Sequence, residues 1–241
     1  MQILVSNLGR TRYAEAWDLQ QRVFDLRRHG LIDDVLLLTE HEHVYTLGKG
    51  GDANHLLASD AELSKDGTEV FRIDRGGDIT YHGPGQIVGY PILDLDKYSP
   101  DIHKYLRSLE DVLIDLLHAF GIKGEREVGM TGVWVRGEKI AAIGVKVSKW
   151  ITMHGFALNV NTDLQKFERI IPCGIFHKGV TSMQRHLGRE IPIEDVERKL
   201  TESFSGVFGC TPVLVSAESL RLRIESLQIQ SSQDSSVEGI S

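Results

Sequence analysis

Glycine is concentrated in three stretches of this chain, and that concentration limits the folds open to it. The chain has 24 glycines among 241 residues, and many of them lie within 48–51, 76–89 and 124–155. Glycine lets the backbone turn tightly or approach another group closely. Because strand-like segments flank these stretches, we expect consecutive strands joined by glycine-rich turns rather than a regular alternation of strands and helices.

Hydrophobic periodicity predicts helices and strands around these turns. Apolar residues at helical spacing predict helices over 12–29, 103–120 and 192–208. Strands are expected over 2–8, 33–47, 69–74, 87–95, 133–135, 140–147 and 151–160. The pattern favours an α+β fold in which a mixed β-sheet is flanked by helices.

The composition is typical of a folded protein from a reducing compartment. Hydrophobic residues make up 41% and charged residues 25% of the chain. No apolar run is long enough to span a membrane, and the first residues do not resemble a secretory signal. The two cysteines, Cys173 and Cys210, are too few for a disulfide framework, so we expect a cytoplasmic protein. The net charge of -7 argues against nucleic-acid binding.

No linker-like segment interrupts the body of the chain. We therefore expect one catalytic domain over 1–210, followed by a C-terminal extension over 211–241. A short helix is expected over 217–227. The serine-rich end after residue 230 has few apolar residues, so we expect the extension to be partly disordered.

Residues 75–86 combine glycines with side chains that form hydrogen bonds. The segment reads Arg-Gly-Gly-Asp-Ile-Thr-Tyr-His-Gly-Pro-Gly-Gln. A strand follows it instead of a helix, which excludes a dinucleotide-binding fingerprint. A turn needs only small residues, whereas arginine, threonine, tyrosine and histidine among the glycines indicate the wall of a ligand site. A purely structural connection between strands is the alternative.

The segments 140–147 and 151–160 predict a hairpin with an unusual face. If a two-residue turn joins them, Gly144 lies opposite Gly155 and Ala142 lies opposite Ala157. Small residues then share one face of the sheet, and the large ones lie on the other. Such a face indicates either a trough for a ligand such as an alkyl chain, or close packing of a helix.

Cys173 lies between a proline and a glycine, which is more typical of a presented side chain than of a core residue. Cys210 has no such setting and is expected to be structural. A thiol with a pKa of about 8.5 is mostly protonated at neutral pH, and a nearby ammonium would make it more reactive. The candidates for that cation or for an alternative base are Lys139, Lys146, His82, His154 and His177.

A metal site is not expected. His41 and His43 alternate on a predicted strand and would share one face. Two ligands without a third make a weak case for a metal.

Four motifs in sequence order resemble a known family, the octanoyltransferases of lipoic acid biosynthesis. They are 75–86, 139–144, 154–159 and 172–174, and the resemblance covers roughly residues 30–185. It implies a fold similar to those of lipoate ligases and biotin protein ligases. It also implies transfer of an octanoyl group from octanoyl-acyl-carrier protein to the ε-amine of a lysine in a lipoyl domain.

The resemblance also implies roles for individual residues. Cys173 would be the nucleophile that carries the acyl thioester, and Lys139 would lower the pKa of the thiol and move protons. Substrate contacts would come from three segments: Arg75, Gly76, Gly77, Asp78, Ile79, Thr80, Tyr81 and His82; Ala142, Ile143 and Gly144; and Gly155, Phe156 and Ala157. Backbone amides near Gly77 or beside Cys173 are the alternative oxyanion donors.

The resemblance implies protein partners and no cofactor. Octanoyl-acyl-carrier protein would be the donor, and the lipoyl domains of 2-oxoacid dehydrogenases and the glycine cleavage H protein would be the acceptors. We expect a monomer that binds neither membrane nor nucleic acid. Two alternatives stay open: an ATP-dependent lipoate or biotin protein ligase on the same fold, and a non-catalytic module that binds lipoyl domains or acyl groups.

One position conflicts with regular strand geometry. Alternation along 139–144 places Lys139 on the opposite face from Ala142 and Gly144. Either a bulge precedes Ala142, or Lys139 belongs to the turn before the strand.

Overall fold

The computed structural model describes residues 1–171 and 179–238, and over these residues the chain folds around an eight-stranded sheet and a three-stranded sheet. The strands are β1 (Gln2–Thr11), β2 (Asp34–His41), β3 (Val44–Leu47), β4 (Glu69–Arg72), β5 (Ile79–His82), β6 (Gln86–Ile92), β7 (Glu125–Glu127), β8 (Met130–Val135), β9 (Glu138–Ser148), β10 (Ile151–Asn159) and β11 (Thr211–Leu214). The α-helices are α1 (Tyr13–Arg28), α2 (Asp60–Lys65), α3 (Ile102–Ala119), α4 (Met183–Leu187), α5 (Ile193–Phe208) and α6 (Ala217–Glu238).

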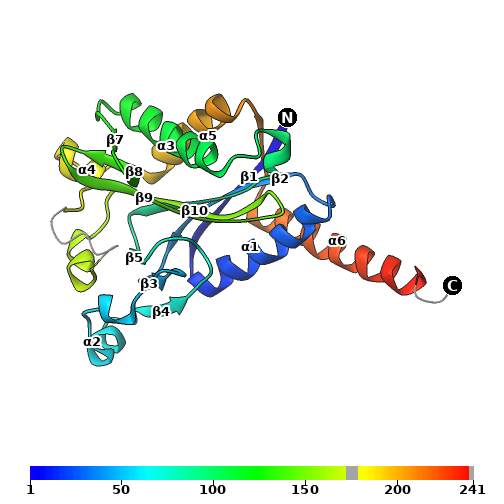
Figure 1. Ribbon diagram of the computed structural model, residues 1–241, viewed down its shortest axis with the longest axis horizontal. Coiled ribbons are helices and arrows are strands. Elements are labelled where there is room, and N and C mark those ends of the chain that lie inside the picture. Colours follow the sequence, from blue (N-terminus) through cyan, green and yellow to red (C-terminus); the bar gives the residue numbers. More distant parts are fainter. Residues whose placement is uncertain (172–178, 239–241) are drawn as a thin grey trace.

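Helices cover both faces of the large sheet, which confirms the expected α+β class. Its strand order is β11-β1-β2-β6-β10-β9-β8-β7. β11 and β2 run parallel to β1, and the remaining neighbours are antiparallel. Figure 1 shows α3 and α5 on one face and α1 with α6 on the other. Within the described part of the chain, no helix has both the length and the apolar character needed to cross a membrane.

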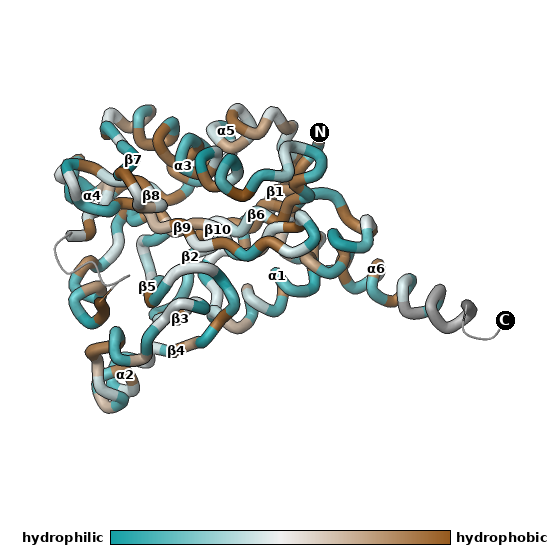
Figure 2. Tube along the Cα trace, viewed as in Figure 1, coloured by the Kyte–Doolittle hydropathy of each residue, from teal (hydrophilic) through white to brown (hydrophobic). Residues whose placement is uncertain are grey.

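α3 covers its face of the sheet with an apolar stripe, as its hydropathy colouring in Figure 2 illustrates. Leu109, Leu113, Leu116 and Leu117 are buried and follow the spacing of one helix side. Asp101 precedes the helix, and its carboxylate accepts hydrogen bonds from two backbone N–H groups of the first turn. The helix expected over 103–120 is therefore confirmed.

The strand expected over 33–47 is two strands, so that prediction was wrong. β2 lies in the large sheet and β3 in the small one, and residues 42 and 43 separate them. Every residue but one of the two strands is buried, and an apolar run of this kind does not mark where a chain bends. The bend carries β3 to the end of the large sheet. There the small sheet, in the order β4-β3-β5, presents the connection over 73–78.

β9 and β10 form the hairpin predicted from the sequence. Gly144 pairs with Gly155 and Ala142 pairs with Ala157, as expected. Phe156 lies in the core on the α3 side of the sheet, whereas Ala157 lies in the core on the α1 side. The separation of small and large residues onto two faces is confirmed.

A bulge interrupts the pairing of β9 with β8. Val133 pairs with Ala141, whereas Trp134 pairs with Lys139. Ile140 is therefore the extra residue, and the side-chain alternation reverses there. Of the two explanations for the position of Lys139, the bulge is confirmed.

Residues 211–238 complete one edge of the molecule. β11 pairs with β1 at the edge of the large sheet. α6 packs against α1, with Leu220 and Ile224 buried in the core between them. The helix expected over 217–227 continues to Glu238.

The turn between β9 and β10 is formed by residues poorly suited to it. Lys149 and Trp150 have φ values of 50° and 61°, which are typical of a type I′ turn, where Asn-Gly is preferred. We expect the double substitution Lys149→Asn and Trp150→Gly to raise the free energy of unfolding by about 1 kcal/mol, because each left-handed residue is strained. Urea denaturation of both proteins measures the difference, and an unchanged or lower value would contradict the prediction.

Candidate functional site

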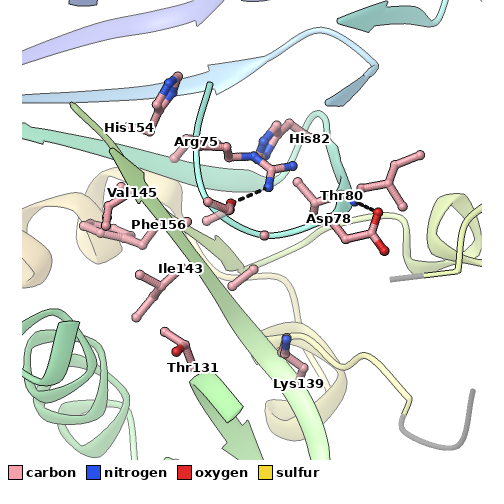
Figure 3. A pocket seen from close by; sticks show the side chains of 18 of the residues that line it. Arg75, Asp78, Thr80, His82, Thr131, Lys139, Ile143, Val145, His154 and Phe156 are labelled. Carbon is pink, nitrogen blue, oxygen red and sulfur yellow. Dashed lines mark hydrogen bonds between the residues drawn. The ribbon is translucent and has the colours of Figure 1, made fainter. Parts of the chain in front are cut away.

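A cavity of about 680 Å³ lies between the small sheet, the β9–β10 hairpin and α3. It is lined by most of the residues predicted from the sequence: Arg75, Gly76, Gly77, Asp78, Ile79, Thr80 and His82; Lys139, Ala142, Ile143 and Gly144; and Gly155, Phe156 and Ala157. Figure 3 shows the connection before β5 lying across the two strands. Three segments far apart in the sequence are therefore brought to one cavity.

Tyr81 is the described member of the predicted set that does not line the cavity. It alternates with Thr80 and His82 on β5, so its ring lies on the other face of the strand. There its hydroxyl forms a hydrogen bond of 2.6 Å with Nδ1 of His43, and its ring packs edge-on against Phe167. Tyr81 thus stabilises the small sheet.

Cys173 and His177 lie outside the described residues. The residues on either side of that gap are described. Ile171 donates its backbone N–H to the carbonyl of His55 at 2.8 Å. Gly179 and Val180 line the cavity.

Side-chain and backbone hydrogen bonds hold the connection over 75–77 above the hairpin. The Arg75 guanidinium donates hydrogen bonds to the carbonyl and the hydroxyl of Thr46 on β3, at 2.6 and 3.0 Å. Gly76 donates its N–H to the carbonyl of Val145 on β9, at 2.9 Å. The connection therefore links the small sheet to the edge of the large one.

The face of small residues has two different uses. A Cβ atom on Gly144 would lie 2.9 Å from the carbonyl oxygen of Gly76, so glycine permits the connection to approach. A Cβ atom on Gly155 would collide with the carbonyl of Gly89 on β6. Ala142 and Ala157 line the cavity itself. The backbone connection packs against one part of this face, and α1 packs against the part that holds Ala157.

Lys139 is fixed by its backbone to the segment that follows the undescribed residues. Its N–H donates to the carbonyl of Gly179, and its carbonyl accepts from the N–H of Thr181, both at 2.9 Å. Its ammonium lies 4.7 Å from the centre of the Trp134 ring, a cation–π contact. The bulge and these two hydrogen bonds together place Lys139 at the cavity.

Of two buried histidines, His82 lines the cavity and His41 lies next to it, with the two ring centres 5.8 Å apart. His82 stacks on Tyr13, with ring centres 6.2 Å apart, and Nε2 of His41 lies 2.6 Å from the hydroxyl of Tyr90. Burial lowers the pKa of His41 to about 4 and the pKa of His82 to about 3. Both rings are therefore neutral at pH 7.

A third histidine, His154, has a strained backbone. Its φ is 60° in the middle of β10, which is rare for a residue other than glycine. Its Nε2 lies 2.8 Å from the carboxylate of Asp74, and the other oxygen of that carboxylate lies 2.6 Å from the ammonium of Lys146. Burial lowers the pKa of His154 although Asp74 opposes the shift. Lys146 is thus paired with a carboxylate near the turn of the hairpin, whereas Lys139 lies at the other end. Figure 3 shows His154 far from Lys139.

The sequence analysis missed several cavity residues. They are Tyr13, Gln86, Val88, Tyr90, Ile102, Leu106, Gly129, Met130, Thr131, Trp134, Val145, Asn159, Phe167, Gly179 and Val180, besides His154, which the sequence suggested only as a base. Gln86 and Asn159 are the last residues of the motifs 75–86 and 154–159, so their polar side chains could have been predicted to line the site. Most of the apolar ones come from α3, β6 and β8, and only the tertiary fold brings them here.

Among the described residues, no three side chains that bind metals come together. His41 and His43 lie on different segments and are bonded to different tyrosines, Tyr90 and Tyr81. The two histidines therefore do not form a shared site.

Comparison with known proteins gives the family. Residues 12–205 match the model of the lipoyl protein ligase A/B catalytic domain. An octanoyltransferase of Rubrobacter xylanophilus is 56% identical over 203 residues, which are 83% of this chain and 91% of that protein. An octanoyltransferase of Christiangramia forsetii is 52% identical over 224 residues, which are 86% and 96% of the two proteins. A crystal structure of lipoate-protein ligase A bound with ATP is 18% identical, with a TM-score of 0.75 over 95% of this chain and 94% of that chain.

These matches extend over most of the chain and of each relative. The chain therefore belongs to the lipoyl protein ligase A/B catalytic domain family and, within it, to the octanoyltransferases. It is an acyltransferase, as the sequence analysis expected. The solved structure confirms the lipoate ligase-like fold.

The buried His82 predicts a specific pH dependence of stability. Its folded-state pKa of about 3 lies below that of an unfolded histidine, about 6.5. The stability contributed by neutral His82 is therefore complete above pH 6.5 and is lost as the pH falls toward 3. By pH 5 the loss is about 2 kcal/mol.

We expect His82→Gln to reduce the difference between the unfolding free energies at pH 7 and pH 5 by that amount. Urea denaturation at the two pH values measures it. His103→Gln, at an exposed position, is the control. An identical pH dependence in the His82 variant and the wild type would show that His82 does not titrate in this way.

Proposed function

We propose that this chain transfers an octanoyl group from octanoyl-acyl-carrier protein to the ε-amine of a lysine in a lipoyl domain, through a thioester on Cys173. One observation carries the proposal: Lys139 shares a cavity with Gly179 and Val180, which follow the segment containing Cys173. The acceptors we propose are lipoyl domains of 2-oxoacid dehydrogenases and the glycine cleavage H protein. The chain acts as a monomer in this proposal and needs no cofactor.

The first proposed step exchanges one thioester for another. The Cys173 thiolate attacks the acyl carbon of the donor, the bond to the carrier's sulfur breaks, and that sulfur leaves as a thiolate, which takes the proton of the Lys139 ammonium. Because both sides of this exchange are thioesters, no ATP is required. A cation near the thiol favours the thiolate. The fixed backbone of Lys139, bonded on both sides to Gly179 and Thr181, supports its assignment to that role.

The second proposed step forms the amide. The lysine amine of the acceptor attacks the acyl carbon, the carbon–sulfur bond breaks, and Cys173 leaves as a thiolate. An amine with a pKa of about 10.4 must lose a proton to become a nucleophile, and that proton passes to the neutral amine of Lys139. The N–H of Gly77 is one candidate donor to the oxyanion, because it has no hydrogen-bond partner among the described residues. The N–H of Gly76, by contrast, is bonded to the carbonyl of Val145.

The cavity lining supports binding of a fatty chain. Ala142, Ala157, Val88 and Phe156 give it apolar walls. Each CH₂ group moved from water into such surroundings contributes about 0.8 kcal/mol. Eight carbons are enough to hold the acyl group by burial alone, without a polar contact along the chain.

A thioester on Cys173 should increase the mass of the protein by one octanoyl group. After mixing with octanoyl-acyl-carrier protein, intact-protein mass spectrometry should detect one added octanoyl group, and hydroxylamine should remove it. We expect Cys173→Ser to lose the hydroxylamine-sensitive adduct. Cys210→Ser is the matched control and should keep it, because Cys210 is buried and burial raises the pKa of its thiol.

The same experiment distinguishes the two alternatives. A Cys173→Ala variant that transfers octanoate only with ATP would indicate a ligase, an alternative favoured by the fold shared with an ATP-bound lipoate-protein ligase A. A chain that binds the donor but forms no adduct and no product would indicate a non-catalytic module.

Replacing Lys139 by arginine should slow only the step in which Lys139 accepts a proton. Lys139→Arg keeps a cation over Trp134, but arginine stays protonated and cannot accept a proton at neutral pH. We expect formation of the acyl-enzyme to persist, whereas transfer to the lysine amine slows about 100-fold or more. Single-turnover measurements of the two steps test this, and a variant that transfers at the wild-type rate would contradict the role.

A further inference from the structure

Three buried polar side chains form a continuous chain of hydrogen bonds along the cavity wall. Nδ1 of His82 lies 2.8 Å from Oε1 of Gln86. Nε2 of Gln86 lies 2.9 Å from Oδ1 of Asn159, and Nδ2 of Asn159 lies 3.0 Å from the carbonyl oxygen of Thr181. His82, Gln86 and Asn159 are 7%, 1% and 4% exposed. We call His82, Gln86, Asn159 and the Thr181 carbonyl the relay.

The direction of every hydrogen bond in the relay is fixed by backbone carbonyls, which only accept. The Thr181 carbonyl requires the NH₂ group of Asn159 to face it, so the Asn159 oxygen faces Gln86. The Tyr81 carbonyl, 3.2 Å from Gln86, requires the NH₂ group of Gln86. The Gln86 oxygen is left to face His82, and an oxygen of this kind accepts only. The proton on the His82 ring must therefore lie on Nδ1.

His154 is held with its proton on the other nitrogen. Its Nε2 lies 2.8 Å from the Asp74 carboxylate, which accepts a hydrogen bond. Its Nδ1 is buried and has no hydrogen-bond partner in the part of the chain that the structure describes. Two neutral histidines of one cavity are thus fixed as opposite tautomers, which makes His154 an internal reference for His82.

We propose that the relay fixes His82 as the Nδ1–H tautomer so that its unprotonated Nε2 accepts a hydrogen bond from the amine that attacks the acyl group. This inference rests on the proposed function. His82 lines the cavity, and Figure 3 shows it beside Arg75. Nε2 orients the attacking nitrogen by accepting one N–H. Gln86 and Asn159 are positioning residues that act through His82.

His82 holds the amine but does not keep its proton. With a pKa lowered by burial to about 3, the ring is far too weak a base to take a proton from an amine at neutral pH. The nitrogen–carbon bond forms, the carbon–sulfur bond breaks, and the proton passes to Lys139 as in the proposed function. A neutral acceptor is suited to orientation because it has no charge to compensate inside the cavity.

The relay also reaches the segment that holds Lys139. The carbonyl of Thr181 accepts from Asn159, and the N–H of Thr181 donates to the carbonyl of Lys139 at 2.9 Å. One residue therefore connects the group that orients the amine with the group that takes its proton. A change in the relay should affect amide formation and leave the earlier thioester exchange unchanged.

Nitrogen NMR of the ¹⁵N-histidine-labelled wild-type protein tests the tautomer while the relay is intact. The chain has 10 histidines, and the signal missing in His82→Gln assigns His82. Couplings from the ring nitrogens to the carbon-bound ring protons distinguish the two tautomers. We expect Nδ1–H for His82 and Nε2–H for His154 at neutral pH, and Nε2–H for His82 would overturn the proposal.

Gln86→Met tests the consequence, because methionine has a similar length but cannot accept the Nδ1–H. We expect the His82 signal to shift toward the Nε2–H tautomer, and the single-turnover transfer to an amine to fall about tenfold, the effect of one lost buried hydrogen bond. Acylation of the enzyme should keep its rate. Thr181→Val is the matched control: it removes the hydroxyl bonded to His186 but keeps the carbonyl used by the relay, so the His82 signal should stay unchanged.

The outcomes separate this inference from the proposed function. Equal loss of both steps in Gln86→Met, or transfer at the wild-type rate despite a shifted tautomer, would overturn the role of His82. If Gln86→Met does not fold, Asn159→Asp replaces it: an aspartate cannot donate to the Thr181 carbonyl, and amide formation should slow while acylation persists. Absence of any acyl-enzyme in the wild type would instead overturn the proposed function, and the tautomer would still be measured.

Discussion

The cavity exists because a backbone connection of the small sheet rests on the edge of the large one. The N–H of Gly76 donates to the carbonyl of Val145, and the side chain of Arg75 holds the other side of the connection to Thr46. The approach is permitted by Gly144, where any side chain would meet the carbonyl of Gly76. Displacement of this connection would separate the predicted substrate-binding segments, since they lie on both sides of that hydrogen bond.

Two buried histidines at the site are uncharged, whereas the buried guanidinium of Arg75 lines the same cavity. Burial keeps His41 and His82 neutral, and each ring has a hydrogen-bond partner, so neither has the large cost of an unpaired buried group. Asp74 and Lys146 form a partly exposed ion pair at one end. Around side chains as buried as these, the direction of a hydrogen bond matters more than in water, because solvent does not readily replace a missing donor.

Local patterns in the sequence predicted much of the fold and part of the site. Strand alternation and an assumed two-residue turn predicted the pairing of Gly144 with Gly155. The conflict at Lys139 left a bulge and a turn as alternatives, and the structure contains the bulge. The division of 33–47 into two strands left no local signal, because β2 and β3 are both buried. The bond from Asn159 to Thr181 spans 22 residues, and periodicity says nothing about contacts at that separation. The roles of Cys173 and Lys139 rest on resemblance and stay predictions.

The relay is proposed to act in amide formation, whereas the cysteine is proposed to act in the thioester exchange before it. An acyl group activated by ATP and one activated as a thioester both end in attack by an amine on the same carbon. In the role proposed for it, a neutral acceptor such as His82 would serve that attack in either case. Only the thioester route requires a thiol next to the cavity. Cys173 is therefore the residue on which the choice between transferase and ligase chemistry depends, whereas the relay of His82, Gln86 and Asn159 is compatible with both.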